Sequence, residues 1–114
     1  MYALKNTVQL IGNLGKAPEV RTLEGGKKMA TFSVATNSNY RNARGEKVEE
    51  TQWHNLVAWG RVAEIAEQYL KKGKEVAIEG RLVNRSYSDK NGIKKYVTEI
   101  VVNELLMLGG KAEG

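Results

Sequence analysis

The stretch TQWHNLVAWG, residues 51–60, is the part of the sequence on which the prediction of the fold depends. If these residues form a β-strand, alternate side chains point to opposite faces. One face then carries Trp53, Asn55, Val57 and Trp59, and the other carries His54, Leu56 and Ala58. Both faces hold bulky side chains, so two interpretations are open: a strand buried on both sides, or a strand whose tryptophan face is a platform for flat ligands.

Strand patterns precede this stretch. Residues 4–14 (LKNTVQLIGNL) have the alternation of a strand, interrupted by Gly12 and followed by Gly15. Glycine at such positions indicates a bulge, a bend or the close approach of another backbone. A short strand is expected at 20–23, and the glycines of residues 24–27 predict a turn.

The next segment, residues 27–38 (KKMATFSVATNS), alternates so that one face is strongly apolar, with Ala30, Phe32 and Val34. Residues 39–50 (NYRNARGEKVEE) are polar and charged, and they lie between two strand patterns. We therefore expect residues 39–50 to form a long hairpin arm that projects from the body of the domain.

The pattern changes after residue 60. Residues 62–72 have the apolar spacing of a one-sided helix, and Gly73 is suited to end it. Residues 74–88 return to strand alternation, with Leu82 on the side assigned to the core, and the Asn-Gly pair within residues 89–92 predicts a hairpin turn. A last strand is expected at 94–108.

The elements follow the order strand, strand, strand, helix, strand, strand. This is the order of the OB-fold, a five-stranded Greek-key barrel with a helix between strands 3 and 4. We predict a mainly β OB-fold domain over residues 1–108 and a disordered end at residues 109–114. Another small five-stranded barrel or half-open sheet with one helix is the alternative.

Composition limits the function. The 114 residues predict one domain, and the net charge of +5 favours a polyanionic partner. The absence of cysteine excludes disulfides, thiolate zinc sites and a cysteine nucleophile. No apolar run suggests a membrane span, and the N-terminal residues lack the layout of a signal peptide. We therefore expect a cytoplasmic protein without a membrane partner.

No set of residues predicts a catalytic centre. His54 is the single histidine, and Glu49 and Glu50 are adjacent, so in a strand they point to opposite faces and cannot act as an acid and base pair. No glycine-rich phosphate loop, EF-hand or HExxH pattern occurs. We expect no enzymatic activity, no catalytic or metal-binding residues and no cofactor.

The aromatic and basic residues are more informative, because they lie on the projecting arm or at exposed strand positions. Aromatic faces stack unpaired bases whatever their identity, and cations follow the phosphates. A duplex hides its base faces, so the combination points to single-stranded nucleic acid. The predicted stacking residues are Tyr40, Trp53, Trp59 and Tyr87, and the predicted phosphate contacts are Arg41, Arg44, Arg61, Lys72, Arg81 and Arg85.

The motifs together resemble those of the bacterial single-stranded DNA-binding protein (SSB) family, in collinear order over nearly the whole chain. They are IGNLG at 11–15, PEVR at 18–21, TQWHNLVAWGRVAE at 51–64, YLKKGKEVAIEGRL at 69–82 and YVTEIVVNELLMLGG at 96–110. The resemblance implies an OB-fold homotetramer that wraps single-stranded DNA during replication, recombination and repair, in association with the nucleoid.

By position, the resemblance assigns base stacking to the same four aromatic residues and phosphate contacts to Arg61, Lys72 and Arg85. It places His54 at a subunit interface. Two positions that are often basic in the family are Val83 and Ser86 here, and Arg81 is the residue that could compensate.

Family members end in an acidic tip that recruits replication and repair proteins, whereas this chain ends in KAEG, so we expect no such tip within its 114 residues. Two other functions fit a small barrel: a related module that binds RNA or protein as a dimer, and a nuclease.

Overall fold

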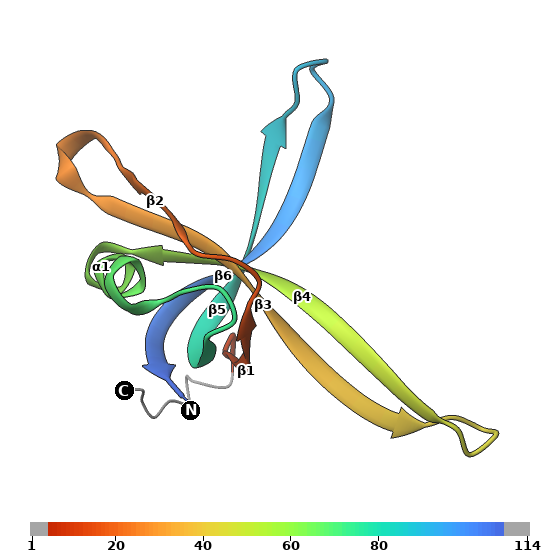
Figure 1. Ribbon diagram of the computed structural model, residues 1–114. Helices are drawn as coiled ribbons and strands as arrows, with labels where there is room; N and C mark the ends of the chain where they lie inside the picture. The colour runs from red at the N-terminus through yellow and green to blue at the C-terminus, as the bar shows by residue number, and fades with distance from the viewer. Residues whose placement is uncertain (1–4, 109–114) are drawn as a thin grey trace.

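The computed structural model describes residues 5–108, which form six strands, one α-helix and a short 3-10 turn (Figure 1). Residues 109–114, for which a disordered end was predicted, lie outside the described residues. In chain order the elements are β1 Val8–Leu14, β2 Glu19–Thr22, η2 Glu24–Gly26, β3 Lys28–Arg41, β4 Lys47–Trp59, α1 Gly60–Tyr69, β5 Glu75–Ser88 and β6 Lys94–Met107.

Five of these strands close into a barrel. The order in the sheet is β1-β5-β6-β4-β3-β2, and β1 also pairs with β3, which joins the two ends and leaves β2 outside as a partner of β3. The closing contact is short, with Asn13 opposite Ala35 and Leu14 opposite Val34. Only β4 and β6 run parallel. This is the predicted OB-fold, with α1 between the third and fourth barrel strands.

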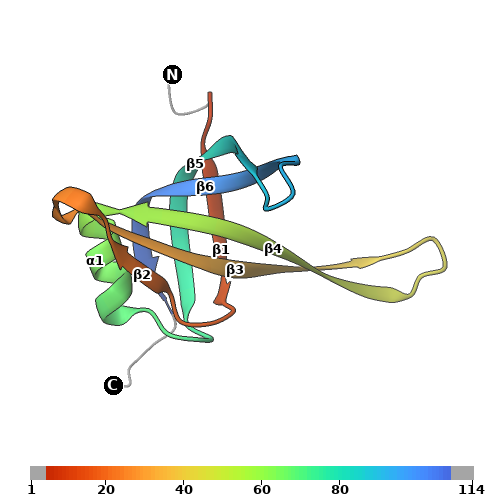
Figure 2. The ribbon, with the colours of Figure 1, turned by 90° about the horizontal axis from the view of Figure 1, so that it is seen from above.

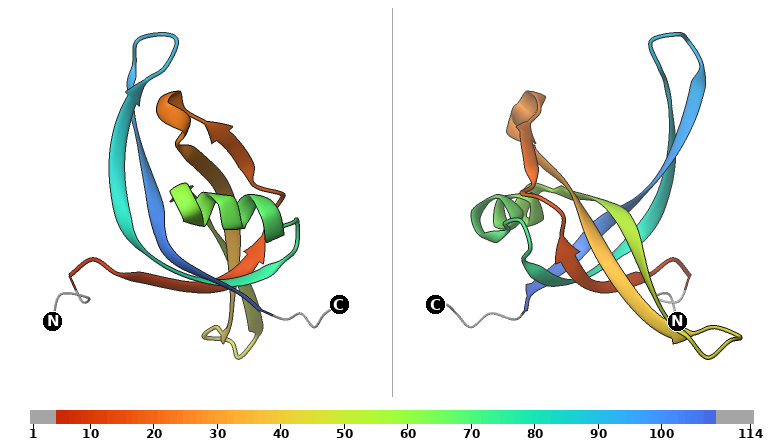
Figure 3. Two further views of the ribbon diagram at one scale, coloured as in Figure 1. Left: turned by 90° about the vertical axis from the view of Figure 1, so that its left-hand side faces the viewer. Right: turned by 45° about the vertical axis from the view of Figure 1, so that its right-hand side comes forward.

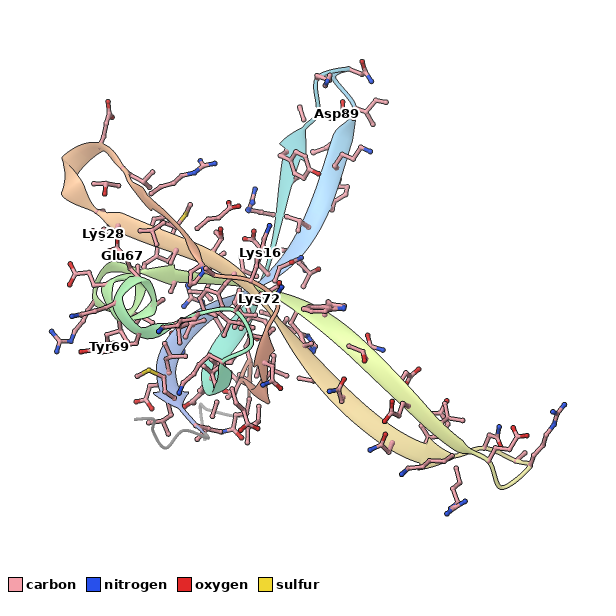
Figure 4. The ribbon with its side chains drawn as sticks, viewed as in Figure 1. Lys16, Lys28, Glu67, Tyr69, Lys72 and Asp89 are labelled. Atoms are coloured by element: carbon pink, nitrogen blue, oxygen red, sulfur yellow. The ribbon has the colours of Figure 1, made fainter. Side chains whose placement is uncertain are left out.

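The helix covers one end of the barrel, as Figure 2 and the left view of Figure 3 show. It packs against β2, β3, β4 and β6, and it buries Ala63 and Ala66 completely. An ion pair of 2.6 Å between Lys28 Nζ and Glu67 Oε1 joins the start of β3 to α1 (Figure 4). The small apolar residues of α1 therefore let the helix close the core that the barrel strands surround.

Three hairpins project from the barrel: β2–β3, β3–β4 and β5–β6 (Figure 1). The predicted arm over residues 39–50 is present, but most of it is strand, because β3 and β4 stay paired as far as Arg41 and Lys47. The turn is closed by the Asn42 side chain, whose Oδ1 accepts hydrogen bonds from the backbone N–H groups of Arg44 and Glu46.

Two details of the prediction are wrong. The helix spans residues 60–69 and not 62–72, because Leu70 takes an extended backbone and places its side chain in the core, where it is 4% exposed. Leu82 was expected in the core and is instead 47% exposed. At this position β5 has left the barrel for the projecting hairpin, so the inward-facing side of the strand no longer covers a core.

Candidate nucleic-acid interface

One outer surface of the barrel gathers most of the predicted binding residues. Trp53 lies opposite Ala35 and Trp59 opposite Met29 in the β3–β4 pair. Paired residues share a face of the sheet, and the face passes from β4 to β6 through Val57 opposite Val101. It then passes from β6 to β5 through Val101 opposite Arg81. We call the surface that bears Trp53, Trp59, Arg81, Arg85 and Tyr87 the aromatic outer face.

The two tryptophans of this face have different surroundings. Trp53 is 60% exposed, although a buried position would be the ordinary one for so large a side chain. Trp59 is half-buried at the other end of the strand, and the ammonium of Lys27 lies 5.2 Å from its ring centroid. Trp53 therefore offers free aromatic surface, whereas Trp59 already holds a cation that a stacked base has to displace or share.

A shallow cleft lies in the middle of the aromatic outer face. It is lined by Lys16, Glu19, Thr31, Phe32, Ser33, Asn55, Leu56 and Glu99. Asn55 is the next residue after Trp53 on that face of β4, and Glu99 lies opposite Val83, between Arg81 and Arg85. The cleft thus connects the exposed indole with the base of the β5–β6 hairpin.

Arg85 has an acidic partner in this region. Its Nε donates to Glu99 Oε1 and its Nη2 to Glu99 Oε2, each at 3.0 Å. The hydrogen bonding and the charge of Glu99 raise the pKa of Arg85 above its ordinary value, so the guanidinium stays charged. A guanidinium has five N–H donors, and three of those on Arg85 are left for a phosphate. Glu99 fixes the direction in which they point.

The arm residues do not all join this face. Tyr40 lies opposite Val48 and so belongs to the other face of the β3–β4 ribbon from Trp53. Arg41 donates from Nη1 to the carbonyl oxygen of Gly45 at 2.8 Å, and Arg44 lies in the turn itself. A strand that touches Tyr40 and Trp53 together has to pass around the edge of the arm.

Arg61 and Lys72 lie elsewhere. Arg61 is at the start of α1 and lines a groove between the helix and the end of β6, together with Ile65 and Leu106. Lys72 precedes Gly73, whose N–H donates to the carbonyl oxygen of Leu14 at 2.9 Å, so Lys72 is next to the end of β1 (Figure 4). Neither side chain makes a hydrogen bond or ion pair with any residue of the range 5–108.

His54 faces the inner side of β4 at the base of the arm. Its Nε2 is 3.0 Å from Thr36 Oγ1, and the side chain is half-buried. His54 also lies opposite Val34, which in turn lies opposite Leu14 of β1. The histidine is therefore two strands away from β1.

The sequence analysis did not single out three charged residues that the fold brings to this surface. Lys27 reaches Trp59 only through the β2–β3 hairpin, and Lys16 and Glu99 meet only across the cleft. Their positions depend on pairings between distant strands, which alternation along one strand does not reveal.

Two further properties concern the part of the chain that is described. No helix among residues 5–108 is both long enough and apolar enough to span a membrane. Within the same range, no three acidic, histidine or cysteine side chains are grouped so that they could hold a metal ion.

Comparison with known proteins gives concordant results. A model of the single-strand binding protein family matches residues 5–108. Single-stranded DNA-binding protein 1 of Chlorobaculum tepidum is 49% identical over 110 residues, which are 96% of this chain and 68% of the relative. The single-stranded DNA-binding protein of Neisseria meningitidis serogroup A is 48% identical over 108 residues, 95% of this chain and 62% of the relative. The chain thus spans about two thirds of the length of these relatives.

Solved structures agree with this match. Plasmodium falciparum SSB in complex with single-stranded DNA aligns with a TM-score of 0.86 and 34% identity, covering 91% of this chain and 95% of that one. A deletion mutant of the single-stranded DNA binding protein from Thermus aquaticus aligns with a TM-score of 0.82 and 30% identity, covering 93% of this chain and 51% of that one. The relatives are named as DNA-binding proteins and not as enzymes, in agreement with the expectation that this chain is not an enzyme.

Proposed function

This chain belongs to the single-strand binding protein family, and we propose that it binds single-stranded DNA without sequence preference. The observation that carries the proposal is the 60% exposure of Trp53 on a face that also bears Trp59, Tyr87 and arginines. Aromatic platforms beside cations suit a ligand that combines flat bases with a charged backbone. The solved complex of the Plasmodium relative contains that ligand.

Base stacking is the source of affinity in this proposal. Trp53 and Tyr87 offer exposed rings on the aromatic outer face, and Trp59 does so once Lys27 moves toward a phosphate. Tyr40 stacks a base beyond the edge of the arm. Each stacked base contributes ~1–3 kcal/mol.

Phosphate contacts supply the electrostatic part. Arg81 and Arg85 flank the cleft on β5, and the remaining cations are distributed along a path around the domain: Arg41 and Arg44 on the arm, Arg61 on α1 and Lys72 beside β1. Their separation supports wrapping of the strand around the domain rather than binding along a single groove. Each phosphate neutralised should lower the slope of log affinity against log salt by ~0.7.

We also propose that the chain forms a homotetramer. One edge of β1 supports this: β1 pairs with β5 from Val8 to Asn13, but with β3 only at Asn13 and Leu14, so residues 8–12 have no strand on their other side within residues 5–108. Ile11 on the adjacent outer face is 60% exposed and Leu106 66%. An open edge beside exposed apolar side chains is suited to pairing with a second copy. In this proposal His54 contacts a neighbouring subunit.

The biological role follows from the binding activity. The protein protects single strands in the cytoplasm, in association with the nucleoid, during replication, recombination and repair. Residues 1–108 form the binding domain, and residues 109–114 are a disordered end. Partner proteins that bind an acidic C-terminal tip are not assigned to these 114 residues.

A matched pair of variants tests the proposal. Tyr87 is 47% exposed on the aromatic outer face, whereas Tyr96, 72% exposed, lies opposite Ser86 and so on the other face of the same hairpin. Binding of oligo(dT) is measured by fluorescence anisotropy for Tyr87→Ala and Tyr96→Ala, with RNA of the same length as competitor. We expect Tyr87→Ala to weaken binding about 5- to 150-fold and Tyr96→Ala to weaken it far less. Equal losses, or preference for RNA, would contradict the proposal.

A further inference from the structure

Gly15 lies against the indole of Trp53. A Cβ atom placed on Gly15 would be 2.7 Å from Cζ3 and 3.1 Å from Cη2 of Trp53, and 3.2 Å from Ser33 Oγ. Non-bonded carbon atoms are ordinarily about 3.5–4.0 Å apart. The six-membered ring of the indole therefore occupies space that any side chain at position 15 would need.

The backbone at Gly15 is held in place. Its N–H donates to the carbonyl oxygen of Ser33 at 3.1 Å. The preceding residue, Leu14, is 3% exposed and exchanges backbone hydrogen bonds with the turn before β5, through Gly73 and Lys74. The indole thus rests on a part of the chain that is fixed by the barrel, while 60% of Trp53 remains open to solvent.

We infer that Gly15 is a positioning residue for single-stranded DNA, which sets the tilt of the Trp53 indole toward a bound base. This inference rests on the proposed function and names a residue to which that function assigned no role. A ring that is already oriented loses less conformational freedom when a base stacks on it, so the support raises affinity. Glycine is needed because a methyl group at position 15 would push the ring away from this orientation.

The consequence of a methyl group differs among the glycines of the barrel. At Gly12 and Gly80 the added Cβ would meet a backbone carbonyl oxygen at 2.2 Å, which only a shift of the strands can relieve. At Gly15 the obstacle is an exposed side chain, which can rotate. Gly15→Ala should therefore fold normally and act on DNA binding.

The test is a set of double-variant cycles read out by affinity for oligo(dT). We expect Gly15→Ala to weaken binding about three- to tenfold, as partial loss of one stacked base. The effect should disappear in the Trp53→Ala background, where there is no indole to displace. It should persist in the Trp59→Ala background, because Trp59 lies at the other end of β4. In a Trp59→Phe protein, which keeps Trp53 as its single tryptophan, Gly15→Ala should also increase acrylamide quenching of the free protein.

Unchanged affinity of Gly15→Ala, or an equal loss in the Trp53→Ala background, would overturn the inference. If Trp53→Ala alone leaves affinity unchanged, the proposed function fails instead, so the two failures are distinguishable. Trp53→Phe gives a second arm in case Gly15→Ala is poorly folded. Phenylalanine lacks the two ring atoms nearest to position 15, so the Gly15→Ala, Trp53→Phe protein should recover folding, and continued misfolding would overturn the inference as well.

Discussion

Replacing Gly12 by alanine should destabilise the barrel at the point where it closes. The added Cβ would lie 2.2 Å from the carbonyl oxygen of Ala35 and 2.8 Å from Cγ1 of Val34. Ordinary contact requires β1 and β3 to separate by roughly 1 Å. Overpacking of this kind costs ~1–3 kcal/mol, and weakening of the hydrogen bond from Gly15 N–H to Ser33 adds ~1 kcal/mol. We therefore expect a loss of about 2–4 kcal/mol in the free energy of unfolding.

Urea denaturation followed by circular dichroism, at one protein concentration for all variants, measures this loss. Gly15→Ala is the matched control, because it adds the same methyl group three residues away and meets only side chains. The control should remain within about 0.5 kcal/mol of the parent protein. A Gly12→Ala protein as stable as the control would refute the close approach of β1 and β3 that closes the barrel.

Three further changes test single contacts. Lys27→Gln removes the ammonium that lies 5.2 Å from the ring centroid of Trp59, so we expect altered Trp59 emission in a Trp53→Phe background; an unchanged spectrum would exclude the contact in solution. Arg81→Gln should reduce the salt slope of DNA binding by ~0.7 with little change in stability, and a parent-like slope would remove Arg81 from the phosphate path. His54→Trp should make the oligomer dissociate at higher protein concentration in sedimentation velocity, and an unaltered profile at nanomolar protein would rule out the interface role.

Much of the fold could be predicted because alternation is a local property. The strand around Trp53, the arm between β3 and β4 and the turn before β6 follow from residues close to them in sequence. The end of α1 could not be predicted in the same way. Lys71 and Lys72 are favourable near a helix end, but Leu70 leaves the helix because its side chain enters the core, and that depends on the barrel.

The candidate site was predictable in its residue types and less so in its geometry. Exposure of Trp53 and Tyr87 followed from strand parity. The partners of the cations did not, since Glu99 meets Arg85 across β5 and β6, and Lys27 meets Trp59 across a hairpin. Gly15 was visible in the sequence as a special position, but the indole that requires it is 38 residues further along the chain.

The most direct test of the central claim is a titration with poly(dT), followed by tryptophan fluorescence at two salt concentrations. Stacking on Trp53 and Trp59 predicts strong quenching on binding. Phosphate contacts predict that affinity falls as salt rises, by ~0.7 in log affinity per log unit of salt for each phosphate neutralised. Absence of both quenching and salt dependence at micromolar protein would contradict the account.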